Sequence, residues 1–274
     1  MVKIAAVLCY SILILILMAD LCHAEGCVKL PQSCQPENKA DINSVDGILE
    51  QLHKQTQKLN SYQCRIEYLF NQPLFESQTL RTGILYYSKS GDKSRLRINF
   101  DTLKQDQEQE QKHPEQYIFD SRQLTHIDYQ IKEVKRYQIA EKNEPNKPTD
   151  AFEMIGRNFP LIGFTKVEDL KREFDIELIE QKTGEPNDFV GLHLKVKSGS
   201  IYKDDYTAID FWMDKKLMLP SKISAISTEG DIYQIQFLQP KVNEKIDEKV
   251  FEFRIPDGFG APEIVPLKKA RKED

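Results

Sequence analysis

The chain has 274 residues, and its 38 Lys and Arg are outnumbered by 43 Asp and Glu, which gives a formal net charge of -5. This acidic balance argues against nucleic-acid binding, because phosphate contacts require clustered basic side chains. The basic run from Lys268 to Lys272 is followed by Glu273 and Asp274, so we expect a solvated, charged tail there.

The N-terminus has the layout of a secretory signal peptide. Met1 to Lys3 carry one positive charge and precede an apolar stretch from Ile4 to Met18. That stretch of about 15 residues is shorter than the roughly 20 that cross a membrane as a helix. The small residues Cys22 and Ala24 predict cleavage after Ala24, and therefore export. An uncleaved anchor and a lipidated Cys27 are the alternatives.

Three cysteines remain after this cleavage. In an oxidising compartment Cys27 and Cys34 could form a disulfide, whereas Cys64 stands on the apolar side of a predicted strand and is expected to be a small core residue. No Cys-x-x-Cys pair occurs. The histidines lack the short spacings that metal coordination requires, since they lie far apart in the sequence at His53, His113, His126 and His193. We therefore predict neither a metal site nor a cofactor.

The chain then changes from one helical period to a series of strands. Apolar residues recur at helical spacing between Asn43 and Leu59, and Asn43 or Ser44 can cap the first turn. Tyr62 to Phe70 alternate between apolar and polar residues, which predicts a strand with one buried face. Similar strands, separated by short turns, are predicted at Gly83–Ser88, Arg95–Phe100, Gln116–Asp120, Gln123–Tyr129 and Glu133–Ile139. Sequential strands without intervening helices favour an antiparallel meander that curves on itself.

Two polar insertions interrupt this pattern. Lys104 to His113 are nearly all Gln, Glu, Asp and Lys, which predicts a mobile hairpin loop, and Glu141 to Asp150 contain two prolines, which predicts a hinge. An apolar segment follows at Phe152 to Phe164, and Lys166 to Glu173 predict a short helix. Further strands are predicted at Phe174–Glu180, Gly191–Lys197, Tyr206–Met213, Pro220–Thr228, Asp231–Leu238 and Val250–Arg254.

These elements predict a mainly β protein of the α+β class, built on one curved antiparallel sheet whose inner face is consistently apolar. No sharp change of composition divides the strands, so we expect a single domain over residues 43–260. It would be preceded by a loosely ordered segment, 25–42, and followed by the charged tail, 261–274.

Several motifs, in their order, resemble the periplasmic lipoprotein carrier superfamily of lipoprotein-localisation and lipoprotein-sorting, LolA-like proteins. Leu59 to Tyr68 resemble that family's first helix and strand, and Gly83 to Tyr87 its second strand. Ile118 to Asp128 are similar to its hairpin, with Ser121 in place of the usual turn glycine, and Phe251 to Phe259 are similar to its closing strand and Pro-x-Gly turn. The Arg-Pro element that follows the family's second strand is absent.

The resemblance implies an unclosed half-barrel with a short helical lid and an apolar cavity for the acyl chains of a lipid or lipoprotein. It also implies a periplasmic location, membrane-bound donor and acceptor proteins, and a role in outer-membrane lipoprotein sorting and protein transport. A buried methylene contributes about 0.8 kcal/mol, so lipid binding requires a continuous apolar lining. The expected lipid-binding residues are Tyr62, Ile66, Tyr68, Tyr86, Ile98, Tyr117, Phe119, Phe211, Tyr233, Ile235 and Phe237, with Phe152, Ile155, Leu161 and Phe164 from the lid.

Three other classes of function are alternatives to a carrier. An envelope sensor of the same fold would bind a lipoprotein or protein partner without shuttling it. A structural envelope protein would fill the inner face with its own aromatic side chains. An enzyme is not expected, because the chain has no Gly-x-Ser-x-Gly, no His-Glu-x-x-His and no glycine-rich phosphate loop.

Overall fold

The computed structural model describes residues 44–91, 93–121, 123–138, 167–180 and 188–265. In this part of the chain the α-helices are α2 (Val45–Gln57) and α4 (Val167–Glu173), with short 3-10 turns at η2 (Pro73–Phe75) and η3 (Glu248–Phe251). The strands are β1 (Ser61–Gln72), β2 (Ser77–Ser90), β3 (Lys93–Gln105), β4 (Gln111–Phe119), β5 (Gln123–Asp128), β6 (Glu133–Gln138), β7 (Phe174–Ile179), β8 (Phe189–Val196), β9 (Tyr206–Asp214), β10 (Leu219–Ser227), β11 (Ile232–Val242) and β12 (Glu263–Val265).

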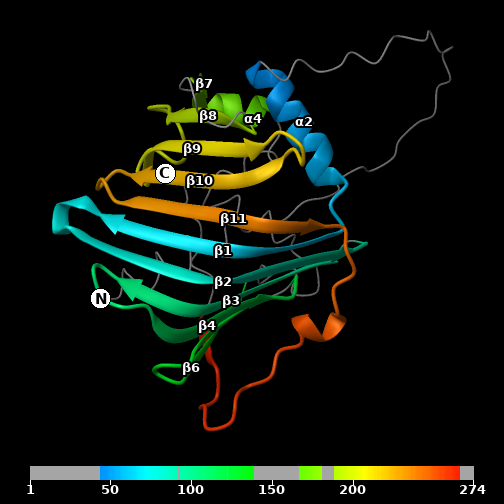
Figure 1. The fold of residues 1–274 in the computed structure, drawn as a ribbon, viewed down its shortest axis with the longest axis vertical. Coiled ribbons are helices and arrows are strands. Elements are labelled where there is room, and N and C mark those ends of the chain that lie inside the picture. Colours follow the sequence, from blue (N-terminus) through cyan, green and yellow to red (C-terminus); the bar gives the residue numbers. More distant parts are fainter. Residues whose placement is uncertain (1–43, 92, 122, 139–166, 181–187, 266–274) are drawn as a thin grey trace, which may run out of the picture.

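All twelve strands belong to one sheet, in the order β12-β6-β5-β4-β3-β2-β1-β11-β10-β9-β8-β7. The sheet consists of two meanders, β1 to β6 and β7 to β11, which the antiparallel pairing of β1 with β11 joins in the middle (Figure 1). Every pairing is antiparallel except the parallel one between β12 and β6. Since β7 and β12 are the two edges, the sheet is not closed into a barrel. The predicted fold class is therefore confirmed.

Helix α2 begins where the sequence predicts. The Ser44 side chain caps it by accepting a hydrogen bond from the Gly47 amide at 3.1 Å. The helix buries Ile48, Leu49 and Leu52 in the main core. It lies beside α4 at the β7 to β10 end of the sheet (Figure 1), and α4 itself matches the short helix predicted there.

The main core lies on the face of the sheet that α2 covers, which we call the inner face. Buried side chains from both meanders contribute to it, including Ile66 and Tyr68 from the first and Phe211 and Leu192 from the second. They alternate along each strand with partly exposed residues, as the period of two predicts. The two meanders therefore share one continuous apolar core.

The opposite, outer face carries a smaller cluster around Ile118, Ile127 and Val134. The segment between β11 and β12 packs over this cluster and is held by arginines: Arg97 donates to the Val250 carbonyl at 2.9 Å, and Arg136 lies over the Phe253 ring. The prediction of a strand at Val250–Arg254 is wrong. Asp247 caps the turn η3 there by accepting from the Lys249 amide, and the segment crosses the outer face instead of pairing.

The polar insertion predicted as a loop at Lys104–His113 is loop only between Gln105 and Gln111. Strand β3 extends to Gln105 and β4 begins at Gln111, so much of the insertion belongs to a long paired hairpin. Polar side chains do not prevent strand pairing where both faces of a hairpin project into solvent. The predicted hinge at Glu141–Asp150 and the predicted lid segment lie outside the described residues.

Strand β2 approaches β3 unusually closely at Gly83, next to a register shift between the two strands. A Cβ atom at Gly83 would lie 2.0 Å from the Asn99 carbonyl oxygen and 2.8 Å from the Phe100 Cα. Both neighbours are backbone atoms, which cannot move aside as a flexible side chain can. Glycine at this position is therefore required by packing.

We expect Gly83→Ala to lower the free energy of unfolding by about 2 to 3 kcal/mol, because the backbone must shift to admit the methyl group. Urea denaturation followed by circular dichroism measures this change. Gly199→Ala is the matched control, since a Cβ there meets no atom within 4 Å, and a change within about 0.5 kcal/mol is expected for it. Equal effects of the two substitutions would contradict the packing argument.

Candidate functional site

The structure brings most of the predicted lining residues together on the inner face. Register places Tyr62, Ile66 and Tyr68 of β1 on the same side as Phe237 and Ile235 of β11. These five side chains are buried, and so are four more of the predicted set, Ile98, Tyr117, Phe119 and Phe211, whereas Tyr233 is partly buried against the same core.

Tyr86 does not belong to this face. It pairs with Gln63 and Arg97, whereas its neighbours Leu85 and Tyr87 are the buried ones. Five successive apolar or small residues occur at Gly83–Tyr87, so the sequence gives no alternation from which to choose the face. The predicted lid residues Phe152, Ile155, Leu161 and Phe164, and the predicted disulfide cysteines Cys27 and Cys34, lie outside the described residues.

One end of the inner face carries a buried ionic cluster. The Glu115 side chain is 5% exposed, and its Oε1 accepts from the Tyr117 hydroxyl at 2.5 Å and contacts His126 Nε2 at 2.6 Å. Its other oxygen forms an ion pair with the Arg81 guanidinium. The Tyr117 ring stacks on the His126 imidazole, with 4.5 Å between centroids. Because Glu115 has a cation on one oxygen and two donors on the other, its burial is compensated.

The expectation of a consistently apolar inner face is therefore wrong at this end. Arg81 and Glu115 lie beyond the predicted ends of their strands, but β2 and β4 continue far enough to place both side chains inside. His126 of β5 is in register with Lys135 of β6, so both side chains project from the same face of the sheet. Polar groups thus occupy the β4 to β6 end, and a purely apolar ligand is confined to the other end of the face.

Toward the β7 end of the sheet, β10 and β11 separate into a cleft that opens on the outer face, where Trp212, Lys222 and Gln236 alternate with buried core residues. The two strands pair only from Lys222 and Gln236 onward, so Leu219–Ser221 of β10 and Phe237–Pro240 of β11 face each other without pairing. Each strand has an irregularity here: Ser221 is an extra residue relative to β9, and Gln239, with φ of 52°, lies in an irregular stretch opposite β1. Because a bulge bends its strand, two facing bulges open the sheet.

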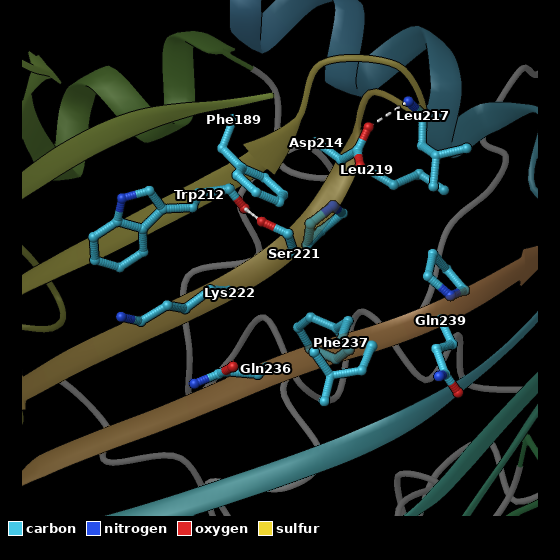
Figure 2. A pocket seen from close by; sticks show the side chains of 13 residues that line it. Phe189, Trp212, Asp214, Leu217, Leu219, Ser221, Lys222, Gln236, Phe237 and Gln239 are labelled. Carbon is cyan, nitrogen blue, oxygen red and sulfur yellow. Dashed lines mark hydrogen bonds between the residues drawn. The ribbon is translucent and has the colours of Figure 1, made fainter. Parts of the chain in front are cut away.

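The cleft encloses about 510 Å³. Leu219 and Phe237, both members of the main core, form its floor, and Figure 2 shows their side chains between the diverging strands. Further lining comes from β8, β9, the β9–β10 turn, β10 and β11, at Phe189, Trp212, Asp214, Leu217, Pro220, Ser221, Lys222, Gln236, Leu238, Gln239 and Pro240. Pro220 and Pro240 have no amide N–H, so the open strand edges carry fewer donors that need a partner.

The polar groups of the cleft differ in availability. Asp214 already accepts hydrogen bonds from the Lys216 amide at 2.7 Å and the Leu217 amide at 2.9 Å, and Ser221 donates to the Trp212 carbonyl at 3.1 Å. The Lys222 ammonium lies 4.4 Å from the centre of the Trp212 ring, a cation–π contact. Trp212, Lys222 and Gln236 project to one side of the cleft in Figure 2, away from Leu217 and Leu219. The cleft therefore has a cation on one side, whereas the side of Leu217 and Leu219 is apolar apart from the Asp214 carboxylate, which already accepts two amide hydrogen bonds.

Of the predicted lining residues only Phe237 lines this cleft. The sequence did not predict the remaining residues of the cleft, because a cleft made by strand divergence depends on how strands pair. Two signals in the sequence point to it: Pro220 begins one predicted strand and Pro240 lies two residues past the end of another, where proline marks an irregular or open edge, and the chain's single tryptophan is Trp212.

Cys64 is a free, buried thiol on the inner face, as predicted, and burial raises its pKa to about 12. A thiol with so high a pKa is a poor nucleophile at neutral pH. In the described ranges no three His, Cys, Asp or Glu side chains converge as metal ligands do. None of the helices in this part of the chain is long and apolar enough to span a membrane.

Comparison with known proteins gives only structural likenesses: neither a protein-family model nor a curated protein sequence matches the chain. An uncharacterized conserved protein from Thermus thermophilus is 11% identical, with a TM-score of 0.44 over 81% of this chain and 98% of that one. MucB, in the MucA/MucB complex of Pseudomonas aeruginosa, is 14% identical at a TM-score of 0.42, over 76% of this chain and 60% of that one.

A LolA superfamily protein from Nitrosomonas europaea is 13% identical at a TM-score of 0.32, over 76% of this chain and 97% of that one. Proteins of the lipoprotein carrier superfamily are thus among the solved structures that this chain resembles. At identities and scores this low, the likeness is one of fold alone.

The buried cluster predicts a pH dependence of stability. Burial, followed by the nearby cations Lys135 and Arg81, lowers the pKa of His126 to about 4, against the opposing effect of Asp128 and Glu133. Above pH 6.5 the imidazole is neutral whether the chain is folded or unfolded. Between pH 6.5 and 4 only the unfolded chain binds the proton, so the free energy of unfolding should fall by on the order of 3 kcal/mol across this window.

Denaturant titrations at half-unit steps from pH 8 to pH 4 measure this fall. His126→Gln keeps a donor for Glu115 but cannot titrate, so its stability should decline less steeply than the wild type over the same window. A variant that declines as steeply as the wild type would show that His126 is not responsible.

Proposed function

We propose that this chain is an exported binding protein that holds the acyl chain of a lipid or a lipid-modified protein in the cleft between β10 and β11. The observation that carries the proposal is the cleft itself, an apolar opening of about 510 Å³ whose floor is the main core. Its size falls within the roughly 300 to 1,000 Å³ of sites that bind small molecules.

The energetics favour an aliphatic ligand. Phe189, Leu217, Leu219 and Leu238 offer apolar contact on several sides of the cleft. Ten buried methylene groups would contribute about 8 kcal/mol before the entropic cost of binding is subtracted. A chain of this kind need not make any directional contact, which suits a lining with few free polar groups.

Lys222 and Gln236 give the ligand an orientation. Lys222 is the cation among the residues that line the cleft, and Gln236 is next to it in the β10–β11 register. We infer that the polar end of the ligand, a carboxylate, phosphate or acyl carbonyl, faces Lys222 and that its tail points toward Leu217 and Leu219. The buried cluster around Glu115 makes the far end of the inner face unsuitable for the tail, because Arg81 would lose its partner there.

We also propose a cellular role, which is based on the N-terminal sequence. Residues 1–24 are proposed to be a cleaved signal peptide, which would deliver residues 43–260 to the periplasm. There the protein would act as a carrier in lipoprotein sorting, receiving an acylated protein from one membrane-bound partner and releasing it to another. No catalytic step is part of this role.

Binding can be followed through the single tryptophan. Because Trp212 lines the cleft, titration with palmitate should shift its emission to shorter wavelength and saturate at one ligand per chain. Phe189→Asp should weaken binding about tenfold or more, because it places a charge beside the tail. Lys222→Gln should weaken palmitate binding while leaving the uncharged methyl ester nearly unaffected.

Ile201→Asp serves as the control, because Ile201 is 62% exposed and does not belong to the cleft. It should bind palmitate as the wild type does. A saturable emission shift that persists unchanged in Phe189→Asp, with the variant folded, would place the ligand elsewhere.

Carrier and sensor roles differ in ligand exchange. Native mass spectrometry of protein purified from its own envelope without detergent should detect co-purifying acylated material, and a carrier should exchange it for added isotopically labelled lipid within minutes. Retention of the original ligand would indicate a sensor that holds its partner stably. Protein that carries no added mass and takes up none would contradict acyl binding.

A further inference from the structure

The turn between β1 and β2 exposes two large apolar side chains side by side. Leu74 is 81% exposed and Phe75 is 68% exposed, and both belong to the 3-10 turn η2. The turn projects beyond the ends of the central strands, at the opposite end of β1 from the β10–β11 cleft (Figure 1). We call Pro73, Leu74, Phe75 and Glu76 the apolar tip.

The apolar tip is fixed in shape. The Glu76 amide donates to the Pro73 carbonyl at 3.2 Å, and Glu76 has φ of 49°, so it ends the turn in the left-handed region. Just beyond it, the Gln78 amide donates to Asp106 Oδ1 at 2.6 Å, and the Asp106 amide donates to the Gln78 carbonyl at 2.8 Å. These bonds tie the start of β2 to the neighbouring β3–β4 hairpin, so little order would be lost on binding.

Such exposure is unfavourable unless something covers it. Burying one such side chain contributes about 1.5 to 3 kcal/mol, and two adjacent ones at a projecting turn form a compact contact. Within the described residues, Leu74 and Phe75 do not belong to either core cluster. Among the described residues the pair is therefore uncovered and available for contact with a partner.

The surroundings of the apolar tip are acidic. Glu76 belongs to it, and Asp106, Glu108 and Glu110 lie in the adjacent turn between β3 and β4. The nearest basic residue of that hairpin, Lys104, pairs with Leu80 further back along the strands. Anionic lipid headgroups and a second copy of this chain, which carries a net charge of -5, would both be repelled.

We propose that the apolar tip is a docking surface for a protein partner that offers an apolar pocket bordered by lysine or arginine. Leu74 and Phe75 would fill the pocket, and the carboxylates around them would pair with its basic rim. Charge of this kind mainly raises the rate and specificity of association, whereas the two apolar side chains supply the affinity.

A random dodecapeptide display library, selected on the full purified chain, tests this chemistry. Enriched peptides should combine aromatic or aliphatic residues with Lys or Arg. A synthetic copy of the most enriched peptide should bind the double variant Leu74→Ser/Phe75→Ser at least about tenfold more weakly than the wild type. Glu108→Lys/Glu110→Lys and 0.5 M NaCl should each weaken its binding as well.

Ile131→Ser is the matched control, because Ile131 is 66% exposed in the turn between β5 and β6. It should bind the peptide as the wild type does. Three results would overturn the proposal: enrichment only of peptides that bind Leu74→Ser/Phe75→Ser unchanged, binding to phosphatidylcholine vesicles that requires Leu74 and Phe75, or a dimer in sedimentation that this double variant abolishes.

Discussion

The pairing of β1 with β11 is the contact on which the rest of this sheet depends. It is where the two meanders meet, and it places Ile66 and Tyr68 beside Phe237 and Ile235 on one face. Without this pairing, each meander would expose the apolar side chains that the other meander helps to bury. The irregular stretch of β11 at Gln239 and Pro240 belongs to this same pairing, so the contact that joins the halves also shapes the cleft.

Local patterns sufficed to predict the elements and one face of most strands. Alternation over Tyr62–Phe70 and over Tyr233–Phe237 identified the core-facing residues correctly, although Phe70 and Tyr233 are only partly buried, because each signal lies within a single strand. Tyr86 was misplaced because apolar residues occupy both faces of its strand. The segment around Phe251 was misjudged as a strand, since an apolar side chain that packs over a sheet produces much the same pattern as one within it.

The cleft and the buried cluster required pairing information that no local window contains. Ser221 and Gln239 form facing irregularities only because β10 and β11 are neighbours, and Arg81 meets Glu115 only because a third strand, β3, lies between theirs. Each of these residues is unremarkable in the sequence, where charged and polar residues are common. The site thus arises from the arrangement of strands, whereas the fold class follows from their periodicity.

The β1–β11 pairing also bears on how fast the chain can reach its native state. It joins residues roughly 160 to 180 positions apart, whereas the other antiparallel pairings are between neighbours in sequence. Hairpins within each meander can close early, but the central ladder must wait until two long segments find each other. Until then the side chains that later line the cleft stand at the open margin of an incomplete sheet, where association with other chains competes with folding.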